Sequence, residues 1–248
     1  MSRAVILVYG DSLSLPRSRA DVHCLETYPE LLRSMLESSQ PGLRVGVLNR
    51  SLGGATIDAL YGHFVKDSAY LGPEAKHILV IQCGIVDCAP RPISPRVKTG
   101  ISRLPTPLRW AAARLLHYAR PLLLKSGVSW RNTEGTEFGR VLERWIARAA
   151  KSAERVYVIN IAPPTPAMDR HSPGVARSVE EYNATIAKVV AASHTASVRL
   201  IDAHGAISTR PDGLTQCINQ ADGHHITSAG HRLYADLIGA LESGEPRR

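Results

Sequence analysis

The sequence predicts an α/β fold in which a five-stranded parallel sheet lies between two layers of helices. Five short apolar runs rich in β-branched residues have the composition of strands that are buried on both faces, and segments with helical patterns separate them. Parallel neighbours need a crossover connection, so the connecting helices cover both faces of the sheet. The expected strands are residues 4–9, 44–49, 77–83, 155–160 and 198–202.

Helix signals are clear in three of the remaining segments, residues 26–39, 178–193 and 227–243. In the first two, a hydroxyl residue precedes a glutamate by three positions, which is the capping-box spacing: Thr27 with Glu30, and Ser178 with Glu181. In the third, leucines recur on one helix face: Leu233, Leu237 and Leu241.

A basic segment interrupts this alternation between the third and fourth strands. The formal net charge of the chain is +8, and residues 91–125 hold six Arg, two Lys and no acid, which equals that whole charge. The first part of the segment is Pro-rich and predicts an extended, non-helical excursion; apolar residues from Leu108 to Ala119 then recur at helical spacing. We expect a single domain over 1–248 with a basic, Pro- and Arg-rich helical insertion at about 90–135.

The arginines of this segment allow two interpretations. They form either a solvated face on a packing helix or a grip for an anionic group, such as a phosphopantetheine arm, a nucleotide sugar, a lipid diphosphate or a membrane surface. Nucleic acid is not expected, because no helix-turn-helix, zinc finger or aromatic stacking motif accompanies the charge, and the chain has only two Phe. The expected partner of residues 91–125 is therefore an anionic ligand or a membrane surface.

Composition places the chain among globular enzymes. A hydrophobic fraction of 44% over 248 residues allows a sizeable core. The apolar run before Gly10 is too short for a signal sequence, which predicts a cytoplasmic protein, and no stretch approaches the roughly 20 apolar residues that span a bilayer. The four cysteines form no CxxC pair, so free thiols are expected rather than a zinc site or disulfides.

Unusual loops follow the first three expected strands. They are GDS at 10–12, NRSLGGAT at 49–56 and CGIVDC at 83–88. Ligands of open parallel sheets bind beyond the carboxyl ends of the strands. The sequence therefore predicts a site where these loops meet at one rim.

Serine acyl transfer chemistry needs a nucleophile, a base, a group that holds the base, and N–H donors for the oxyanion. Ser12 lies at the turn after the first strand, where backbone N–H groups are unpaired. Asp222 and His225 lie three residues apart before the last helix, close enough for one turn to join them. Gly54 has no Cβ, so its backbone can approach a substrate. Taken alone, Ser12 would suit a helix cap and the Gly pair a tight turn.

These residues resemble the SGNH, or GDSL, hydrolases. GDSL at 10–13 is similar to the nucleophile block, NRSLGGAT to the glycine block, and DGHH at 222–225 with the following ITSAGHRLYADLI to the final DxxH block. The resemblance implies a flavodoxin-like three-layer fold, ester hydrolysis or acyl transfer without a metal or cofactor, and a triad of Ser12, His225 and Asp222. It also implies an oxyanion hole made by the N–H groups of Ser12 and Gly54.

One block departs from the family pattern. GIVD at 84–87 stands where the family has GxND, so Val86 replaces an Asn whose amide donates to the oxyanion. Loss of one such donor costs on the order of 3 kcal/mol in the transition state, roughly 10²- to 10³-fold in rate. Gln82, Arg91 and Arg17 are the candidate replacements. Asp11, Arg17, Val86, Asp87 and Arg91 are the residues expected around the substrate, with Asp87 also organising its loop.

The leading prediction is a serine esterase that forms an acyl-Ser12 intermediate on a glycan or other small-molecule ester, with weak turnover on generic esters because of Val86. One alternative is an O-acyltransferase for a sugar or glycan intermediate, in which the arginines hold a phosphate-bearing donor or acceptor. The other is a catalytically silent binding module. His224 beside His225 suggests a metal pair, but no third ligand is apparent, and neither a metal nor a cofactor is expected.

Overall fold

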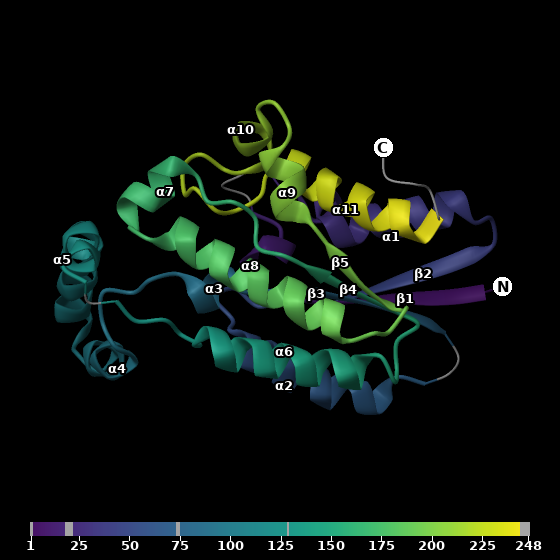
Figure 1. The fold of residues 1–248 in the computed structure, drawn as a ribbon, viewed down its shortest axis with the longest axis horizontal. Helices are drawn as coiled ribbons and strands as arrows, with labels where there is room; N and C mark the ends of the chain where they lie inside the picture. The colour runs from purple at the N-terminus through teal and green to yellow at the C-terminus, as the bar shows by residue number, and fades with distance from the viewer. Residues whose placement is uncertain (1, 18–21, 73–74, 128, 244–248) are drawn as a thin grey trace.

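A five-stranded, all-parallel sheet in the order β2-β1-β3-β4-β5 forms the centre of the molecule (Figure 1). The computed structural model describes residues 2–17, 22–72, 75–127 and 129–243. The strand bounds agree with the predicted runs to within two residues, and the expected fold class is confirmed. The strands are β1 (Ser2–Gly10), β2 (Leu43–Asn49), β3 (Lys76–Gln82), β4 (Arg155–Ile159) and β5 (Val198–Ile201).

Helices cover both faces of this sheet. Figure 1 shows α1 and α11 together on one face and α2, α6 and α8 on the other. The long helices are α1 (Tyr28–Ser39), α2 (Ile57–Asp67), α6 (Gly135–Ala149), α8 (Val175–Ala192) and α11 (Ser228–Ser243). Shorter elements are α7 (Pro166–His171), α9 (Ala203–Ser208), α10 (Gly213–Cys217), η1 (Ser12–Ser14), η3 (Cys24–Glu26) and η4 (Ser68–Tyr70).

The core lies where the sheet is buried on both sides. Strands β1 and β3 run through it, and Ile6, Val8, Leu79 and Val80 are almost fully buried. The register pairs Gly10 with Gln82, so β1 and β3 reach the rim side by side. All four cysteines are free thiols, as expected from their spacing, and three of them are buried.

Both predicted capping boxes are absent. Thr27 is the N-cap of α1, but its hydroxyl donates to the carbonyl of Cys24 rather than accepting from the helix. Ser178 lies inside α8, which begins three residues earlier after Gly174. The spacing of two residues does not by itself fix where a helix begins. Neither pair therefore forms the reciprocal hydrogen bonds of a capping box.

The basic insertion leaves the sheet after β3. It contains α3 (Ile85–Cys88), α4 (Pro95–Ser102) and α5 (Thr106–Lys125), and Figure 1 shows α4 and α5 at the end of the molecule opposite the N-terminus. The expectation of an entirely non-helical Pro-rich part was wrong. Ser94 caps α4 by accepting from the Val97 N–H, and proline suits the first turn of a helix, where no N–H partner is needed.

Helix α5 presents part of its apolar surface to solvent, although Leu124 is buried. The large apolar side chains Leu115, Tyr118 and Leu122 are each about 70% exposed, at 69%, 69% and 74%. Arg120, near the end of the same helix, is partly buried, and its guanidinium donates to the Pro90 carbonyl. Within the described chain, no helix is both long enough and apolar enough to cross a membrane.

Candidate active site

Ser12 follows directly after β1 at the rim of the sheet. The Asp11 N–H donates to the carbonyl of Gln82, which fixes the end of β1 against β3. The carboxylate of Asp11 accepts from the Leu13 N–H at 2.9 Å and so holds the short helix η1 that begins at Ser12. The local sequence therefore presents the Ser12 hydroxyl at the carboxyl end of β1.

Two residues expected near the substrate are buried beneath this turn. Asp11 is fully buried, and burial raises the pKa of its carboxyl to about 7. Gln82 is 3% exposed, and its Oε1 accepts from the hydroxyl of Ser14 at 2.8 Å. We therefore correct the placement of Asp11 around the substrate and of Gln82 as an oxyanion donor, since both support the nucleophile turn from behind.

Ser12, His225 and Asp222 come together although more than 200 residues separate the serine from the other two. The Ser12 Oγ lies 2.8 Å from Nε2 of His225. On the other side of the ring, Nδ1 of His225 lies 3.0 Å from Oδ2 of Asp222, and the His225 backbone N–H donates to Oδ1 at 3.0 Å. This is the order of contacts that a serine triad requires.

The turn that carries Asp222 and His225 is tightly built. Gly223 has a φ of 78°, and a Cβ there would lie 2.5 Å from the hydroxyl oxygen of Thr165. The N–H of Gly223 donates to the carbonyl of Asn219, whose own N–H donates to the carbonyl of His225. A glycine between the two catalytic candidates thus lets the loop close against α7.

The His225–Asp222 contact is close but imperfectly aligned. The Nδ1 atom lies at contact distance from Oδ2, yet the ring N–H direction does not meet hydrogen-bond geometry with any described acceptor. Catalytic hydrogen bonds in unliganded enzymes are commonly misaligned and tighten when substrate binds. Burial by itself would raise the pKa of Asp222, but the donated N–H groups of His225 and His224 hold that pKa below its usual value.

Arg17 reaches the same imidazole. One of its guanidinium nitrogens contacts Nε2 of His225, and another lies 3.7 Å from Asp222 Oδ2. Burial, together with the neighbouring His224 and the Arg17 cation, lowers the pKa of His225 to about 4 although Asp222 opposes the shift. His225 is therefore neutral and able to accept a proton over the physiological range.

The backbone donors expected for the oxyanion are free of other partners. No described residue accepts a hydrogen bond from the N–H of Ser12 or of Gly54. Gly54 has a φ of 75° and lies in the exposed loop after β2, which the Leu52 N–H ties to the carbonyl of Gly10. Gly54 does not line the cavity at Ser12, so its role as a donor stays a prediction.

The GIVD loop is held by contacts that the sequence did not identify. The buried carboxylate of Asp87 accepts from the Ile57 N–H at 3.2 Å and from the Thr133 hydroxyl at 2.5 Å. Asp87 thus organises the loop, and it does not line the cavity at Ser12, which corrects its expected place around the substrate. The Val86 carbonyl accepts from Asn132 at 2.8 Å and from Arg91 at 3.2 Å.

A cavity of about 270 Å³ opens at Ser12. Val86 and Arg91 line it as expected, and Arg120 is a further charged residue that sequence reasoning did not place there. Its other lining residues are Ile85, Ala89, Met168, His171, Ser172, Asp222 and His224. A larger hollow of about 780 Å³ runs between α6 and α8 but holds none of the triad residues. We therefore locate the candidate site at the smaller cavity.

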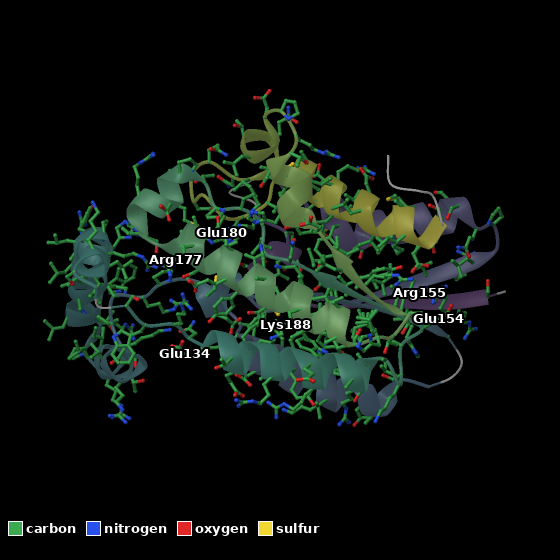
Figure 2. All side chains as sticks on the ribbon, viewed as in Figure 1. Glu134, Glu154, Arg155, Arg177, Glu180 and Lys188 are labelled. Carbon is green, nitrogen blue, oxygen red and sulfur yellow. The ribbon has the colours of Figure 1, made fainter. Side chains whose placement is uncertain are left out.

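The position of this cavity follows from the direction of the strands. It lies at their carboxyl ends, on the side of the sheet from which the insertion projects. Figure 2 shows Glu154 and Arg155, just before and at the start of β4, at the opposite end of the molecule. The site therefore occupies the rim predicted for ligands of an open parallel sheet.

The triad residues overlap with one group that could hold a metal ion. Ligand-type atoms of Asp222, His224 and His225 lie within 4.8 Å of one another. Nε2 of His225, however, is directed at the Ser12 hydroxyl, and the Arg17 cation contacts that same nitrogen. A second cation beside it would be repelled, so this arrangement fits a proton-accepting histidine better than a metal ligand.

Comparison with known families agrees with this geometry. The model of the GDSL-like lipase/acylhydrolase family matches residues 8–233. The chain belongs to this family. The match includes Ser12 at its beginning and the Asp222–His225 turn near its end, and it makes this GDSL-like protein an ester-hydrolysing serine hydrolase.

Solved structures show that the GDSL-like fold extends over almost the whole chain. The lipase/acylhydrolase from Enterococcus faecalis is 17% identical with a TM-score of 0.65, and the alignment covers 99% of both chains. The acetylxylan esterase Axe2 from Geobacillus stearothermophilus is 14% identical with a TM-score of 0.61, covering 99% of this chain and 97% of that one. TesA is 18% identical with a TM-score of 0.57, covering 96% and 97%. No curated protein matches the sequence.

Proposed function

We propose that this protein hydrolyses a small-molecule or glycan ester through an acyl-Ser12 intermediate. The observation that carries the proposal is the contact of 2.8 Å between Ser12 Oγ and His225 Nε2, with Asp222 on the opposite ring nitrogen. A serine hydroxyl is a weak nucleophile at neutral pH and needs such a base. The low pKa of His225 supports this role, because it keeps the imidazole neutral and able to accept a proton.

Each step then uses a residue of this chain. Neutral His225 takes the hydroxyl proton while Ser12 Oγ bonds to the acyl carbon, and Asp222 stabilises the imidazolium that forms. The oxyanion faces the N–H groups of Ser12 and Gly54. As the C–O bond to the alcohol breaks, His225 returns the proton to the leaving oxygen. Water, deprotonated by His225, then attacks the acyl carbon, and as the bond to Ser12 Oγ breaks, His225 returns the proton to that oxygen and the carboxylic acid is released.

Turnover of unspecialised esters should be slow. Val86 lines the cavity without a side-chain donor, and the Arg17 cation beside Nε2 opposes protonation of His225 during the reaction. A missing oxyanion donor alone costs on the order of 10²- to 10³-fold in kcat. We therefore expect measurable but weak activity on short aryl esters.

A fluorophosphonate probe and a short-chain aryl-ester assay test the proposal together. Wild-type protein should incorporate the probe at Ser12, as located by peptide mass spectrometry, and should release the phenol. Ser12→Ala should lose both signals. Ser34→Ala is the matched control, because Ser34 is an exposed residue on α1 whose hydroxyl donates to the Glu30 carbonyl. Probe incorporation elsewhere, or turnover that survives in Ser12→Ala, would sink the proposal.

Acyl transfer shares the first half of this reaction. A sugar hydroxyl would replace water in the second step, and a larger hollow beside the cavity, lined by Arg91 and Arg120 as well, offers room for such an acceptor. Incubation with an acyl donor and candidate sugar acceptors separates the two outcomes. Acylated sugar would indicate a transferase, and free acid alone would indicate hydrolysis. A folded protein that gives neither product nor probe incorporation would be the binding module.

A further inference from the structure

Two partly buried arginines lie beside the nucleophile without carboxylate partners. Arg91 and Arg120 both line the cavity of Ser12. Arg91 donates to the Val86 carbonyl, while Arg120 donates to the Pro90 carbonyl and to the hydroxyl of Ser172. These acceptors are neutral. No described acid forms an ion pair with either guanidinium, so their positive charge is left unbalanced at the site.

Burial of two uncompensated cations carries a cost in free energy. Burial lowers the pKa of Arg91 and, together with the adjacent Arg91 cation, that of Arg120. The negative charge of Asp87 partly opposes this lowering of the Arg91 pKa. The Asp87 oxygens, however, already accept hydrogen bonds from Ile57 and Thr133. The Nε–H of Arg91 is buried, and no described atom accepts a hydrogen bond from it. A bound anion would offset the repulsion between the two guanidinium groups, and it would accept a hydrogen bond from the Arg91 Nε–H.

Arg131 shows how a nearby arginine is satisfied when it has only a structural role. Its guanidinium lies 2.6 Å from Glu181 Oε2 and packs over the ring of Tyr182. Arg131 also lines a hollow that adjoins the Ser12 cavity. In this region the fold therefore does place an acid, Glu181, beside an arginine. The lack of a comparable acid therefore distinguishes Arg91 and Arg120 from Arg131, and their burial distinguishes them from the exposed arginines of α5.

The two arginines stand between two hollows. The Ser12 cavity shares Arg91, Arg120 and His171 with a hollow of about 600 Å³ that is lined by residues within 91–132 of the insertion and by His171 of α7. Lys98, His117 and Arg131 are the other basic or titratable residues along its lining, and no described acid lines it. A molecule with its ester at Ser12 would thus extend past both guanidinium groups.

We propose that Arg91 and Arg120 bind an anionic group, a phosphate or a carboxylate, carried by the ester substrate whose acyl group Ser12 attacks. The inference rests on the proposed function, and it specifies the substrate class for that site. Guanidinium groups donate in a planar fork that matches both kinds of anion. The basic insertion is then a specificity element that selects charged esters over neutral ones.

Three aryl acetates that differ only in the para substituent test the inference. They are 4-acetoxybenzamide, which is neutral, 4-acetoxybenzoate and 4-acetoxyphenyl phosphate, and each kcat/KM is divided by the rate of hydroxide-catalysed hydrolysis of the same ester. We expect at least one anionic ester to exceed the neutral ester by about tenfold to hundredfold. The better of the two anions identifies the group. Inorganic phosphate should inhibit hydrolysis of the preferred anionic ester and spare the neutral one.

Arg91→Gln and Arg120→Gln should each reduce this anion preference about tenfold or more. Arg109→Gln is the matched control, because Arg109 is an exposed arginine on α5, the helix that carries Arg120. Arg120 also anchors α5 through Pro90 and Ser172, so Arg120→Lys, which keeps the charge, is included. A structural defect would lower the rates of all three esters together, whereas loss of the anion site changes their ratio.

Failure of the inference and failure of the proposed function give different results. Equal normalised rates for the three esters, with Ser12 still acylated, would overturn the anion site and leave the esterase standing. If Ser12 proves unreactive, calorimetric titration of the Ser12→Ala protein with 4-hydroxyphenyl phosphate and with 4-hydroxybenzoate, against 4-hydroxybenzamide, still measures the site. Anion binding that Arg91→Gln abolishes would support it, and no binding of either anion would refute it.

Discussion

At the scale of single residues, Arg17 contacts His225, the candidate catalytic base, and contributes to the lowering of its pKa. A cation beside Nε2 disfavours the imidazolium form, and burial and His224 act in the same direction. The pKa of His225 is about 4, so the base remains unprotonated down to that pH. The sequence placed Arg17 among the candidates near the oxyanion, and the structure places it against the base.

The pH profile of kcat/KM should show this effect. Activity needs neutral His225, so the acid limb of the wild-type profile is expected near pH 4 rather than near 6.5, the usual pKa of histidine. Arg17→Ala removes one cause of the lowering, and its acid limb should move to higher pH. Burial and His224 remain, so the limb should stay below 6.5.

Arg109→Ala provides the control for this prediction, since it removes the same charge from an exposed position on α5. Its acid limb should coincide with that of the wild type. An acid limb near pH 6.5 in all three proteins would contradict the structural account of His225.

Val86 gives a second test at this scale. It lines the cavity in a half-buried position, and an asparagine there would restore a side-chain N–H donor. Val86→Asn is expected to raise kcat on 4-acetoxybenzamide by roughly 10- to 100-fold, less than the full value of a native donor because its geometry is not evolved. Val86→Leu has nearly the shape of asparagine without the donor and should not raise kcat. An equal rise in both variants would show that cavity shape, and not the donor, limits the rate.

At the scale of secondary-structure elements, the contact between α1 and α11 depends on a buried histidine. His231 is 1% exposed, and its Nδ1 accepts from the backbone N–H of Tyr28 at 3.1 Å. The Tyr28 N–H lies in the first turn of α1, where the helix itself provides no acceptor. His231 on α11 accepts from it and so caps α1. Burial lowers the pKa of His231 to about 4, since a buried imidazolium would be poorly solvated.

This contact should weaken in acid. The unfolded chain protonates this histidine near pH 6.5 and the folded protein near 4, so its contribution to stability is complete above pH 6.5 and falls as the pH drops toward 4. The loss is on the order of 3 kcal/mol. Asp11 and Asp87 have raised pKa values and act in the opposite direction, so the wild-type curve alone does not isolate the effect.

His231→Asn isolates it, because asparagine keeps an acceptor for Tyr28 but does not titrate. Urea unfolding of both proteins at pH 7.5 and 4.5 gives the comparison. The difference in unfolding free energy, wild type minus variant, should be about 2 to 3 kcal/mol smaller at pH 4.5. Parallel stabilities at the two pH values would contradict the assignment of His231.

At the scale of the whole molecule, positive charge and exposed apolar surface gather in the same projecting lobe. Residues 91–125 carry eight basic residues and no acid, and the leucines at positions 115 and 122 of α5 face solvent beside Arg114 and Lys125. Basic and apolar side chains on one exposed helix suit the interface of an anionic membrane. We therefore expect this lobe to bring the protein to such surfaces.

Cosedimentation with vesicles tests this expectation. Binding should be stronger to vesicles containing phosphatidylglycerol than to pure phosphatidylcholine, and it should weaken with salt. Leu122→Ser should reduce binding, whereas Leu25→Ser, at a similarly exposed leucine away from the insertion, should not. No preference for anionic vesicles would refute the expectation. A dimer in light scattering that Leu122→Ser dissociates would instead assign this face to self-association.

Prediction from the sequence was most accurate where the signal is a periodic pattern of apolar residues or a short spacing between two residues. The five strands and their rim loops follow from apolar runs and from the requirement for crossovers, and the spacing of three positions from Asp222 to His225 suffices to hold a carboxylate at an imidazole. Capping was predicted less well. A box motif depends on where the first turn begins, and tertiary packing moved that point at Ser178.

The sequence by itself determined the parallel sheet, the rim and the candidate triad, because strand period, loop position and short-range spacing are properties of the chain. Only the tertiary structure decided what surrounds the triad. It buried Asp11, Gln82 and Asp87 as supports, set Arg17 against His225, and turned Arg120 inward beside Arg91. Each of these outcomes depends on contacts between segments distant in sequence, and residue spacing carries no record of such contacts.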